Sequence, residues 1–346
     1  MIDKSEYYHN ILTHYASIRH LQNGQMVAPR FCTFQTSNQC NQNCMGCSFG
    51  GLNNKALNNT MMSEADHIRI LYKLIDVGVR GFEFCGGGEP TLLPYLSHLF
   101  HILKTNNKAF GIITNGVKLN SSLIDYLSTC GTYCRISLEA SNIEDYVKYK
   151  RVPSKHWSMV LRNVSAIAAI KDRVCDVSLK FDVGCTLNGK KHYEDAIKIG
   201  TELGVDSVQF KFLRHEPEEL SVDEKYIEQT KLELVMRDTK TGVNIIDGLV
   251  PDQSIEDIPQ CWLNPIHTVV DHLGDVYICC YYYYRGDEHK IGNMLKNDFE
   301  YFWDAPEHME KIKNINRLDC HKIDCKFFAH HVTINSAFKN GRVEFL

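Results

Sequence analysis

The sequence predicts an α/β protein in which an open, partial barrel of parallel strands precedes a small cysteine-rich domain. Two observations predict it. Between residues 28 and 215, short runs rich in β-branched and aromatic residues alternate with longer helical stretches, and repeated strand–helix units give parallel strands covered by outer helices. Beyond residue 259, cysteines flank a predicted β-hairpin. A chain of 346 residues is long enough for both parts.

Six strands are expected in the first part: Arg30–Ser37, Gly81–Cys85, Phe110–Thr114, Tyr133–Glu139, Val177–Thr186 and Ser207–Leu213. The stretches between and after them are typical of helices: Ser63–Val79, Leu93–Asn106, Ser121–Cys130, His156–Ala169, Lys190–Leu203 and Asp223–Val235. Six units are fewer than the eight of a closed barrel, so the barrel should be open, with its active site at the carboxyl ends of the strands.

Polar and apolar residues alternate along several of these strands. Side chains alternate across a strand, and the outer helices cover the apolar face, so the polar face should point into the barrel. The expected inward set includes Glu83, Arg135, Ser137, Glu139, Lys180, Asp182, Gln209 and Lys211. Burying so many charges without a ligand would be unfavourable, which favours a ligand cavity. The alternative is that some only pair with each other, as Lys180 could with Asp182.

Three cysteines follow the first predicted strand in the run CNQNCMGC, at Cys40, Cys44 and Cys47. Thiolates are soft ligands that suit iron–sulfur clusters and zinc, and a cubane cluster normally takes four of them. Three ligands on one loop leave one iron without a protein ligand, and an open coordination position is typical of a catalytic metal site. The run therefore indicates a catalytic iron–sulfur site.

This run resembles the signature of the radical S-adenosylmethionine (radical SAM) superfamily. Three further motifs resemble those that follow or end the second, third and fourth strands of that family: CGGGEP at Cys85–Pro90, ITNG at Ile113–Gly116 and RISLE at Arg135–Glu139. The four motifs occur in order and cover roughly residues 28–215. The resemblance implies a partial, TIM-like (β/α)6 barrel.

The resemblance also implies the chemistry. A [4Fe–4S] cluster on Cys40, Cys44 and Cys47 would bind S-adenosylmethionine, whose cleavage gives a 5′-deoxyadenosyl radical that takes a hydrogen atom from the substrate. The implied cofactor-binding residues are Gly87, Gly88, Glu89, Thr114, Asn115, Ser137 and Glu139. The chain departs from the family pattern at Gly46, where a large or aromatic residue is usual.

The implied contacts of these residues differ. Gly87 and Gly88 would let the backbone approach the methionine moiety, a role that favours residues without a Cβ. Glu89 would accept a hydrogen bond from its ammonium group, although an ordinary carboxylate at a helix N-terminus is the alternative. Ser137 and Glu139 would contact the ribose hydroxyls.

The cysteines near the C-terminus flank a predicted hairpin made of Ile266–Val270 and Asp275–Cys279. This pattern resembles the SPASM and twitch domains of many radical SAM enzymes, and it resembles the single-cluster twitch version because no cysteine follows Cys325. The resemblance implies a second, auxiliary [4Fe–4S] cluster held by four thiolates: Cys261, Cys279, Cys320 and Cys325.

Alternatives remain for this second site. The last two cysteines are separated by four residues rather than the usual two, and Cys280 is another possible ligand. Four cysteines also suit zinc. The adjacent His330 and His331 are interpreted as surface residues or as neighbours of the ligands.

The expected domains are an N-terminal extension (1–27), the barrel (28–237), a connector (238–258) and the auxiliary cluster domain (259–346). A hydrophobic fraction of 44% and a charged fraction of 23% are typical of a globular protein. The net charge of −4, without a basic block, argues against nucleic acid as a partner. No apolar run approaches the ~20 residues of a membrane span, and the N-terminus lacks a signal-peptide core, so a cytoplasmic protein is expected.

The polar lumen favours a small polar substrate, and the resemblance to radical SAM enzymes with a single auxiliary cluster implies a sugar-like or aminocyclitol-like one, including nucleotide-linked molecules. Asp182, Gln209 and Lys211 are the expected substrate contacts, and Lys180, Glu83 or Arg135 the expected proton acceptor. An auxiliary cluster could accept the electron left on the substrate, so oxidation, dehydration or epimerisation is expected, with flavodoxin or ferredoxin as reductant. The alternatives are a peptide maturase that forms thioether or carbon–carbon cross-links, and a non-catalytic iron–sulfur or zinc protein.

Overall fold

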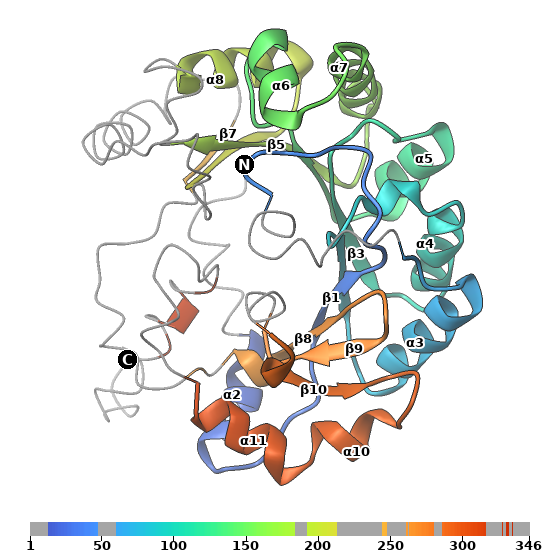
Figure 1. The fold of residues 1–346 in the computed structure, drawn as a ribbon, viewed down its shortest axis with the longest axis vertical. Helices are drawn as coiled ribbons and strands as arrows, with labels where there is room; N and C mark the ends of the chain where they lie inside the picture. The colour runs from blue at the N-terminus through green and yellow to red at the C-terminus, as the bar shows by residue number, and fades with distance from the viewer. Residues whose placement is uncertain are drawn as a thin grey trace.

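The computed structural model describes residues 13–47, 60–183, 192–212, 244–247, 261, 263–279, 286–315, 327, 330, 331 and 334. The strands among these residues form one ten-stranded sheet in the order β10-β9-β8-β1-β2-β3-β4-β5-β6-β7. The sheet curves, and the helices that connect its parallel strands lie on its outer side (Figure 1). This is the predicted α/β partial barrel.

Six parallel strands form the barrel wall: β1 (Phe31–Gln35), β2 (Gly81–Cys85), β3 (Ala109–Thr114), β4 (Tyr133–Ser137), β5 (Asp176–Val183) and β6 (Ser207–Phe212). They confirm the six predicted strands to within a few residues. A further parallel strand, β7 (Asn244–Asp247), pairs with β6. It lies within the predicted connector, where a four-residue strand among turn formers and acids leaves little sequence signal.

The helices that flank these strands are α3 (Glu64–Asp76), α4 (Leu96–Thr105), α5 (Ser121–Cys130), α6 (Ile143–Lys150), α7 (Lys155–Ala168) and α8 (His192–Leu203). Polar N-cap side chains fix the N-termini of several of these helices. Ser63 Oγ accepts the N–H of Asp66 at the start of α3, and Asn120 accepts that of Leu123 at α5, which satisfies donors that a helix N-terminus leaves unpaired. The predicted helix Asp223–Val235 lies outside the described residues.

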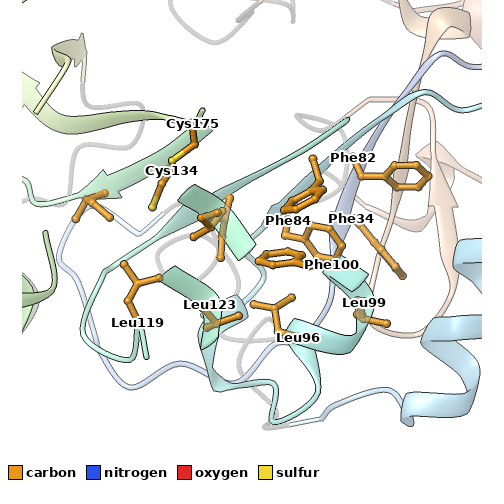
Figure 2. Close-up of a cluster of buried hydrophobic side chains, with 14 of the residues drawn as sticks. Phe34, Phe82, Phe84, Leu96, Leu99, Phe100, Leu119, Leu123, Cys134 and Cys175 are labelled. Carbon is orange, nitrogen blue, oxygen red and sulfur yellow. The ribbon is translucent and has the colours of Figure 1, made fainter. Parts of the chain in front are cut away.

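The main core lies between the sheet and the outer helices (Figure 2). Phe100 of α4 packs against Phe84 of β2 and Phe110 of β3, with ring centroids 5.2 and 4.5 Å apart. All three are essentially inaccessible to solvent, and burying each contributes about 1.5–3 kcal/mol. Alternate residues of every barrel strand join this core, so the polar residues between them face the inside of the barrel, as predicted.

The C-terminal part continues the same sheet. Its elements are η5 (Asn264–Ile266), β8 (His267–Val270), β9 (Asp275–Tyr277), η6 (Asp287–His289), β10 (Lys290–Asn293), α10 (Phe299–Trp303) and α11 (Pro306–Lys313). β8 and β9 form the predicted hairpin, and β8 pairs in parallel with β1, where His267 is opposite Phe31. The hairpin strand β8 therefore lies directly beside the barrel strand that precedes the cysteine loop.

The predicted N-terminal extension contains α2 (Tyr15–Gln22). Its buried residues Ile18 and Leu21 form a small second core with Leu263, Ile266 and Ile334 of the C-terminal part. This core connects α2 with the C-terminal part. None of the helices in the described ranges combines the length and the apolar character needed to cross a membrane.

Candidate active site

The loop that carries Cys40, Cys44 and Cys47 begins at the carboxyl end of β1. Its backbone is attached to the last turn of α6: the N–H of Met45 donates to the carbonyl of Tyr149 over 2.8 Å, and that of Asn43 to the carbonyl of Lys150 over 3.1 Å. The last four carbonyls of a helix have no intrahelical donor. The loop supplies donors to two of them and is held in place by them.

The glycine motif after β2 packs against the beginning of the same loop. The N–H of Gly88 donates to the carbonyl of Ser37, and the N–H of Glu89 to that of Gln39, both over 2.7 Å. A Cβ on Gly88 would lie 1.9 Å from the Gln39 carbonyl oxygen, and one on Gly87 would lie 2.9 Å from that of Ser37. Both glycines therefore permit close contact between two backbones. Their expected contact with the methionine moiety stays a prediction.

Glu89 connects the ends of β2 and β3. Its Oε1 accepts hydrogen bonds from the backbone N–H of Thr91 (3.0 Å) and from the hydroxyls of Thr91 and Thr114, and its Oε2 accepts the N–H of Asn115 (2.7 Å). Burial raises the pKa of Glu89, and these hydrogen bonds oppose the rise. Glu89 also caps the short 3-10 helix η2 (Pro90–Leu92), which agrees with the alternative of a terminal carboxylate. Contact with a cofactor ammonium group stays a prediction.

A charged network lies at the ends of β4 and β5. The ammonium of Lys180 forms ion pairs with Glu139 (3.0 Å) and with Asp182, and the hydroxyl of Tyr149 donates to Asp182 over 2.7 Å. The pairing of Lys180 with Asp182 that the sequence left open is present. Burial and the nearby Asp182 charge raise the pKa of Glu139 to about 7. Burial opposes ionisation of Asp182 as well, but Lys180 and the hydrogen bonds outweigh it and lower its pKa.

Glu139 has a backbone φ of 67°, in the left-handed region that non-glycine residues seldom adopt. Its N–H and that of Leu138 both donate to the carbonyl of Lys180, which holds this conformation. Strained residues of this kind cluster at functional sites. The Glu139 carboxylate is thereby directed to Lys180 at the carboxyl end of the barrel.

Lys150 is a residue that the sequence analysis missed. Its ammonium is buried, donates to the backbone carbonyl of Ser137 over 2.8 Å, and lies near Cys44. Burial raises the pKa of Cys44 to about 11, and the charge of Lys150 opposes this rise. A buried cation thus favours the thiolate form that a cluster requires. The sequence signal that could have identified Lys150 is its position in the last turn of the helix that follows the RISLE motif.

A second polar group lies deeper in the barrel. Glu83 accepts hydrogen bonds from the hydroxyls of Thr33 (3.1 Å) and Tyr133 (2.8 Å). Gly111 of β3 makes room for this contact, because a Cβ there would lie 2.4 Å from the Tyr133 ring. The Thr33 hydroxyl also contacts Nε2 of His267 at 2.8 Å. This hydrogen-bonded group connects β1, β2 and β4 with β8.

Arg135 lies on β4, two residues nearer the carboxyl end than Tyr133, and donates from Nη1 to Oε1 of Gln209 over 3.2 Å. Its Nε is buried, and no residue in the described part of the chain accepts its hydrogen. Lys211 occupies β6 opposite Asp182, and its side chain lies outside the described residues. The inward side chains with described contacts thus lie in three groups: Glu83 with Thr33 and Tyr133, Arg135 with Gln209, and Lys180 with Glu139 and Asp182.

The donor set at the cysteine loop fits an iron–sulfur cluster. Within the described ranges, no three His, Cys, Asp or Glu side chains converge closely enough to hold a metal ion. Three thiols on one loop are soft donors of the kind that iron–sulfur clusters take, and they would leave one iron of a cubane without a protein ligand. The buried Lys150 ammonium near Cys44 favours the thiolate form of that ligand. Binding of a cluster there requires the thiols to lose their protons.

Cys261 and Cys279 are brought to the open end of the β8–β9 hairpin. Cys279 follows β9, and the side chain of Asn264 donates to the carbonyl of the adjacent Ile278, which joins the segment after Cys261 to the one before Cys279. Both thiols are partly accessible. The other predicted ligands lie outside the described residues: Cys320 and Cys325, and the alternative Cys280.

Two sequence-family models match the chain. The model of the radical SAM superfamily matches residues 34–210, and the SPASM model, described as an iron–sulfur cluster-binding domain, matches residues 261–326. A comparison with curated proteins found no match.

Solved structures with the same fold include SuiB of Streptococcus suis bound to the precursor peptide SuiA. It is 14% identical, with a TM-score of 0.65 over 95% of this chain and 76% of that chain. Native anSMEcpe with bound AdoMet is 18% identical, with a TM-score of 0.64 over 87% of both chains. At these identities the likeness shows the fold.

The family matches agree with the motifs and with the barrel that carries them. They confirm the predicted family, fold class and cofactors, which are S-adenosylmethionine and iron–sulfur clusters. Since the superfamily model spans just over half of the chain, this protein is a member of the radical SAM superfamily, with a SPASM domain after its barrel.

Proposed function

We propose that this radical SAM enzyme oxidises a carbinol carbon of a small polar substrate, sugar-like or aminocyclitol-like, including nucleotide-linked forms. The ligand sets expected from the sequence are part of the proposal: Cys40, Cys44 and Cys47 for the catalytic cluster, and Cys261, Cys279, Cys320 and Cys325 for the auxiliary one. When bound, the first cluster and S-adenosylmethionine supply the radical that removes a hydrogen atom from the substrate.

The observation that carries the proposal is Arg135. Its Nη1 contacts Gln209 on the inner face of the barrel, while its buried Nε has no acceptor among the described residues. A buried donor without an acceptor costs about 1–3 kcal/mol. A hydroxyl, phosphate or carboxylate oxygen of a polar substrate would satisfy it, which is what a sugar-like molecule offers.

The charged network at the strand ends supports the same substrate class. Lys180 and Asp182 are linked to each other and to Tyr149, so their orientations are fixed before a substrate binds. Fixed polar groups orient a ligand with less loss of entropy than mobile ones. An apolar substrate would remove water from these charges and offer no polar contacts in its place, which is unfavourable.

Oxidation of the substrate requires a proton acceptor as well as an electron acceptor. Removal of the C–H hydrogen leaves a carbon radical; loss of the O–H proton and of one electron then gives the carbonyl product. Lys180 is already bound by two carboxylates, and a guanidinium such as that of Arg135 does not act as a base in proteins. We therefore assign proton acceptance to Glu83, whose carboxylate is oriented by Thr33 and Tyr133. The electron would pass to the auxiliary cluster.

The test measures 5′-deoxyadenosine after anaerobic reconstitution, with a reductant, S-adenosylmethionine and separate panels of sugars, aminocyclitols, nucleotides and peptides. We expect a sugar, aminocyclitol or nucleotide to stimulate its formation, and deuterium at the oxidised carbon to appear in it. Stimulation by peptides alone would overturn the proposal in favour of a peptide maturase.

Two variants test the assigned residues. Arg135→Met should raise KM for the identified substrate by about tenfold or more, as expected for a lost hydrogen bond to a charged group, whereas Arg162→Met on the exposed outer face of α7 should not. Glu83→Gln should lower product formation by about 10²-fold or more while 5′-deoxyadenosine still forms. Unchanged product formation in Glu83→Gln would exclude this residue as the proton acceptor.

A further inference from the structure

A C-terminal segment packs beside the proposed auxiliary cluster site. Within it, the N–H of His331 donates to the carbonyl of Phe327 over 3.1 Å, a helical contact. Ile334 is buried in the small second core with Leu263 and Ile266, and the ring of Phe327 packs edge-on against His267 at 5.2 Å. Phe327, before His331, and Ile334, after it, thus both contact the beginning of the SPASM domain.

This attachment buries His331, which is only 1% exposed. His331 is therefore not a surface residue, and its position agrees with the other interpretation, that of a neighbour of a predicted ligand. Its Nε2 lies 3.6 Å from Sγ of Cys261, within the range of a hydrogen bond to sulfur. The SPASM match ends at residue 326, so His331 lies beyond the segment that the family pattern describes.

The distance admits two chemical roles. Two ligands of one tetrahedral zinc, at about 2.3 Å for sulfur and about 2.0 Å for nitrogen, would also lie about 3.5 Å apart. In a cubane cluster, however, each iron takes one protein ligand. An imidazole this close to a cluster thiolate is therefore placed to donate a hydrogen bond to its sulfur rather than to bind the same iron.

We propose that His331 donates a hydrogen bond from Nε2 to the Cys261 thiolate of the auxiliary cluster and thereby raises the reduction potential of that cluster. The inference rests on the auxiliary cluster in the proposed function, but it does not depend on the substrate. His331 is thus a positioning residue, because it acts on the cluster through the Cys261 thiolate.

The direction follows from charge. Reduction adds an electron to the cluster and its thiolates, and a donor aimed at sulfur stabilises the more negative state more strongly. Hydrogen bonds to cluster sulfurs are among the features that set cluster potentials. A higher potential makes a cluster a better electron acceptor, which is the role that substrate oxidation requires.

The experiment compares full-length, reconstituted wild type with His331→Leu, His331→Gln and the control His330→Gln. Iron and sulfide are counted, and the auxiliary cluster is titrated by redox potentiometry monitored by electron paramagnetic resonance. Repeating the titration with Cys40, Cys44 and Cys47 changed to alanine assigns the signal to the auxiliary cluster.

We expect His331→Leu to keep its full iron content and to titrate at a lower potential. The shift should correspond to at least about a tenfold change in the reduction equilibrium, or 59 mV for one electron. His331→Gln, which keeps an N–H donor, should recover part of the shift, and His330→Gln should titrate like wild type.

Three results would overturn the proposal. An unchanged potential in His331→Leu would show that no hydrogen bond of consequence exists. A loss of auxiliary iron in both His331 variants, with full iron in His330→Gln, would make His331 a ligand. Zinc instead of iron at this site would remove the auxiliary cluster, and with it the electron-transfer part of the proposed function. A potential shift in the absence of any sugar-stimulated turnover would leave this inference intact and contradict only the substrate proposal.

Discussion

The side-chain amide of Asn115 donates a hydrogen bond to Oδ1 of Asn41 over 2.7 Å. Asn115 lies just after β3 and Asn41 lies beside the first cysteine of the loop, so the contact joins two segments that are distant in sequence. The backbone N–H of Asn115 donates to Glu89 as well, and its Oδ1 accepts the N–H of Val117. One residue thus fixes the cysteine loop, the glycine motif and the end of β3 relative to each other.

We expect Asn115→Ala to weaken S-adenosylmethionine binding by about tenfold, the effect of losing one to two hydrogen bonds that orient the site. Binding can be followed by equilibrium dialysis and by the change in the electron paramagnetic resonance spectrum when the cofactor is added. Asn106→Ala, at the end of α4, removes a hydrogen bond to the carbonyl of Ile102 instead and should bind normally. Equal binding by both variants would show that the Asn115–Asn41 contact does not position the cofactor site.

Gly88 offers a test of how closely the cysteine loop must approach the glycine motif. A Cβ at this position would lie 1.9 Å from the backbone oxygen of Gln39, and backbone cannot move aside as a flexible side chain can. Gly88→Ala should therefore displace the loop and lower the occupancy of the catalytic cluster, with about four irons lost per chain. Gly81→Ala, where the nearest atom is 3.4 Å away, is the matched control. Full iron content in Gly88→Ala would mean that the loop tolerates the shift.

The barrel could be predicted from the sequence because its strands carry a period-two pattern. Phe82 and Phe84 alternate with Glu83, just as Leu179 and Phe181 alternate with Lys180. The four apolar side chains lie in the core under the outer helices, and the two charged ones face the inside of the barrel. The pairing of Lys180 with Asp182 follows from the same rule, since residues i and i+2 share a face of a strand.

Contacts that depend on packing between distant segments could not be predicted. Lys150 lies near Cys44 only because α6 packs against the cysteine loop. This helix is eight residues long, and the sequence analysis did not predict it. His331 reaches Cys261 across 70 positions of sequence. Neither contact has a periodic pattern or a local motif, because each is set by where a short helix packs rather than by its own sequence.

The turn of the β8–β9 hairpin contains a buried acid that should make stability depend on pH. Asp271 is 2% exposed, and its Oδ1 accepts the N–H groups of Leu273 and Asp275, both over 2.9 Å. Burial raises the pKa of Asp271 to about 7, although these hydrogen bonds oppose the rise. A raised pKa means that the folded state holds the proton more tightly than the unfolded chain, where the pKa is about 3.9.

The contribution of Asp271 to stability is therefore fully present below about pH 4 and is lost as the pH rises through 7. Asp271→Asn keeps an acceptor oxygen and cannot ionise, so its stability relative to wild type should rise between pH 5 and pH 8, by at most about 4 kcal/mol. Urea unfolding of the reduced apoprotein at several pH values measures this. The exposed Asp304→Asn is the control. A difference that is constant with pH would show that Asp271 is ionised throughout.

The number of clusters decides which part of the mechanism stands. Two cubane clusters predict about eight irons per chain after anaerobic reconstitution, and about four when Cys40, Cys44 and Cys47 are all changed to alanine. Cys261→Ala should instead lower the auxiliary iron and leave the signal that responds to S-adenosylmethionine. Changing the buried Cys32 to alanine removes a thiol from the core beneath the outer helices, and this variant should retain both clusters.

About four irons in wild type and none in the triple variant would mean that the C-terminal cysteines bind zinc or no metal. The substrate electron would then have no auxiliary cluster to receive it, and a redox-neutral reaction such as epimerisation would replace oxidation as the expected outcome.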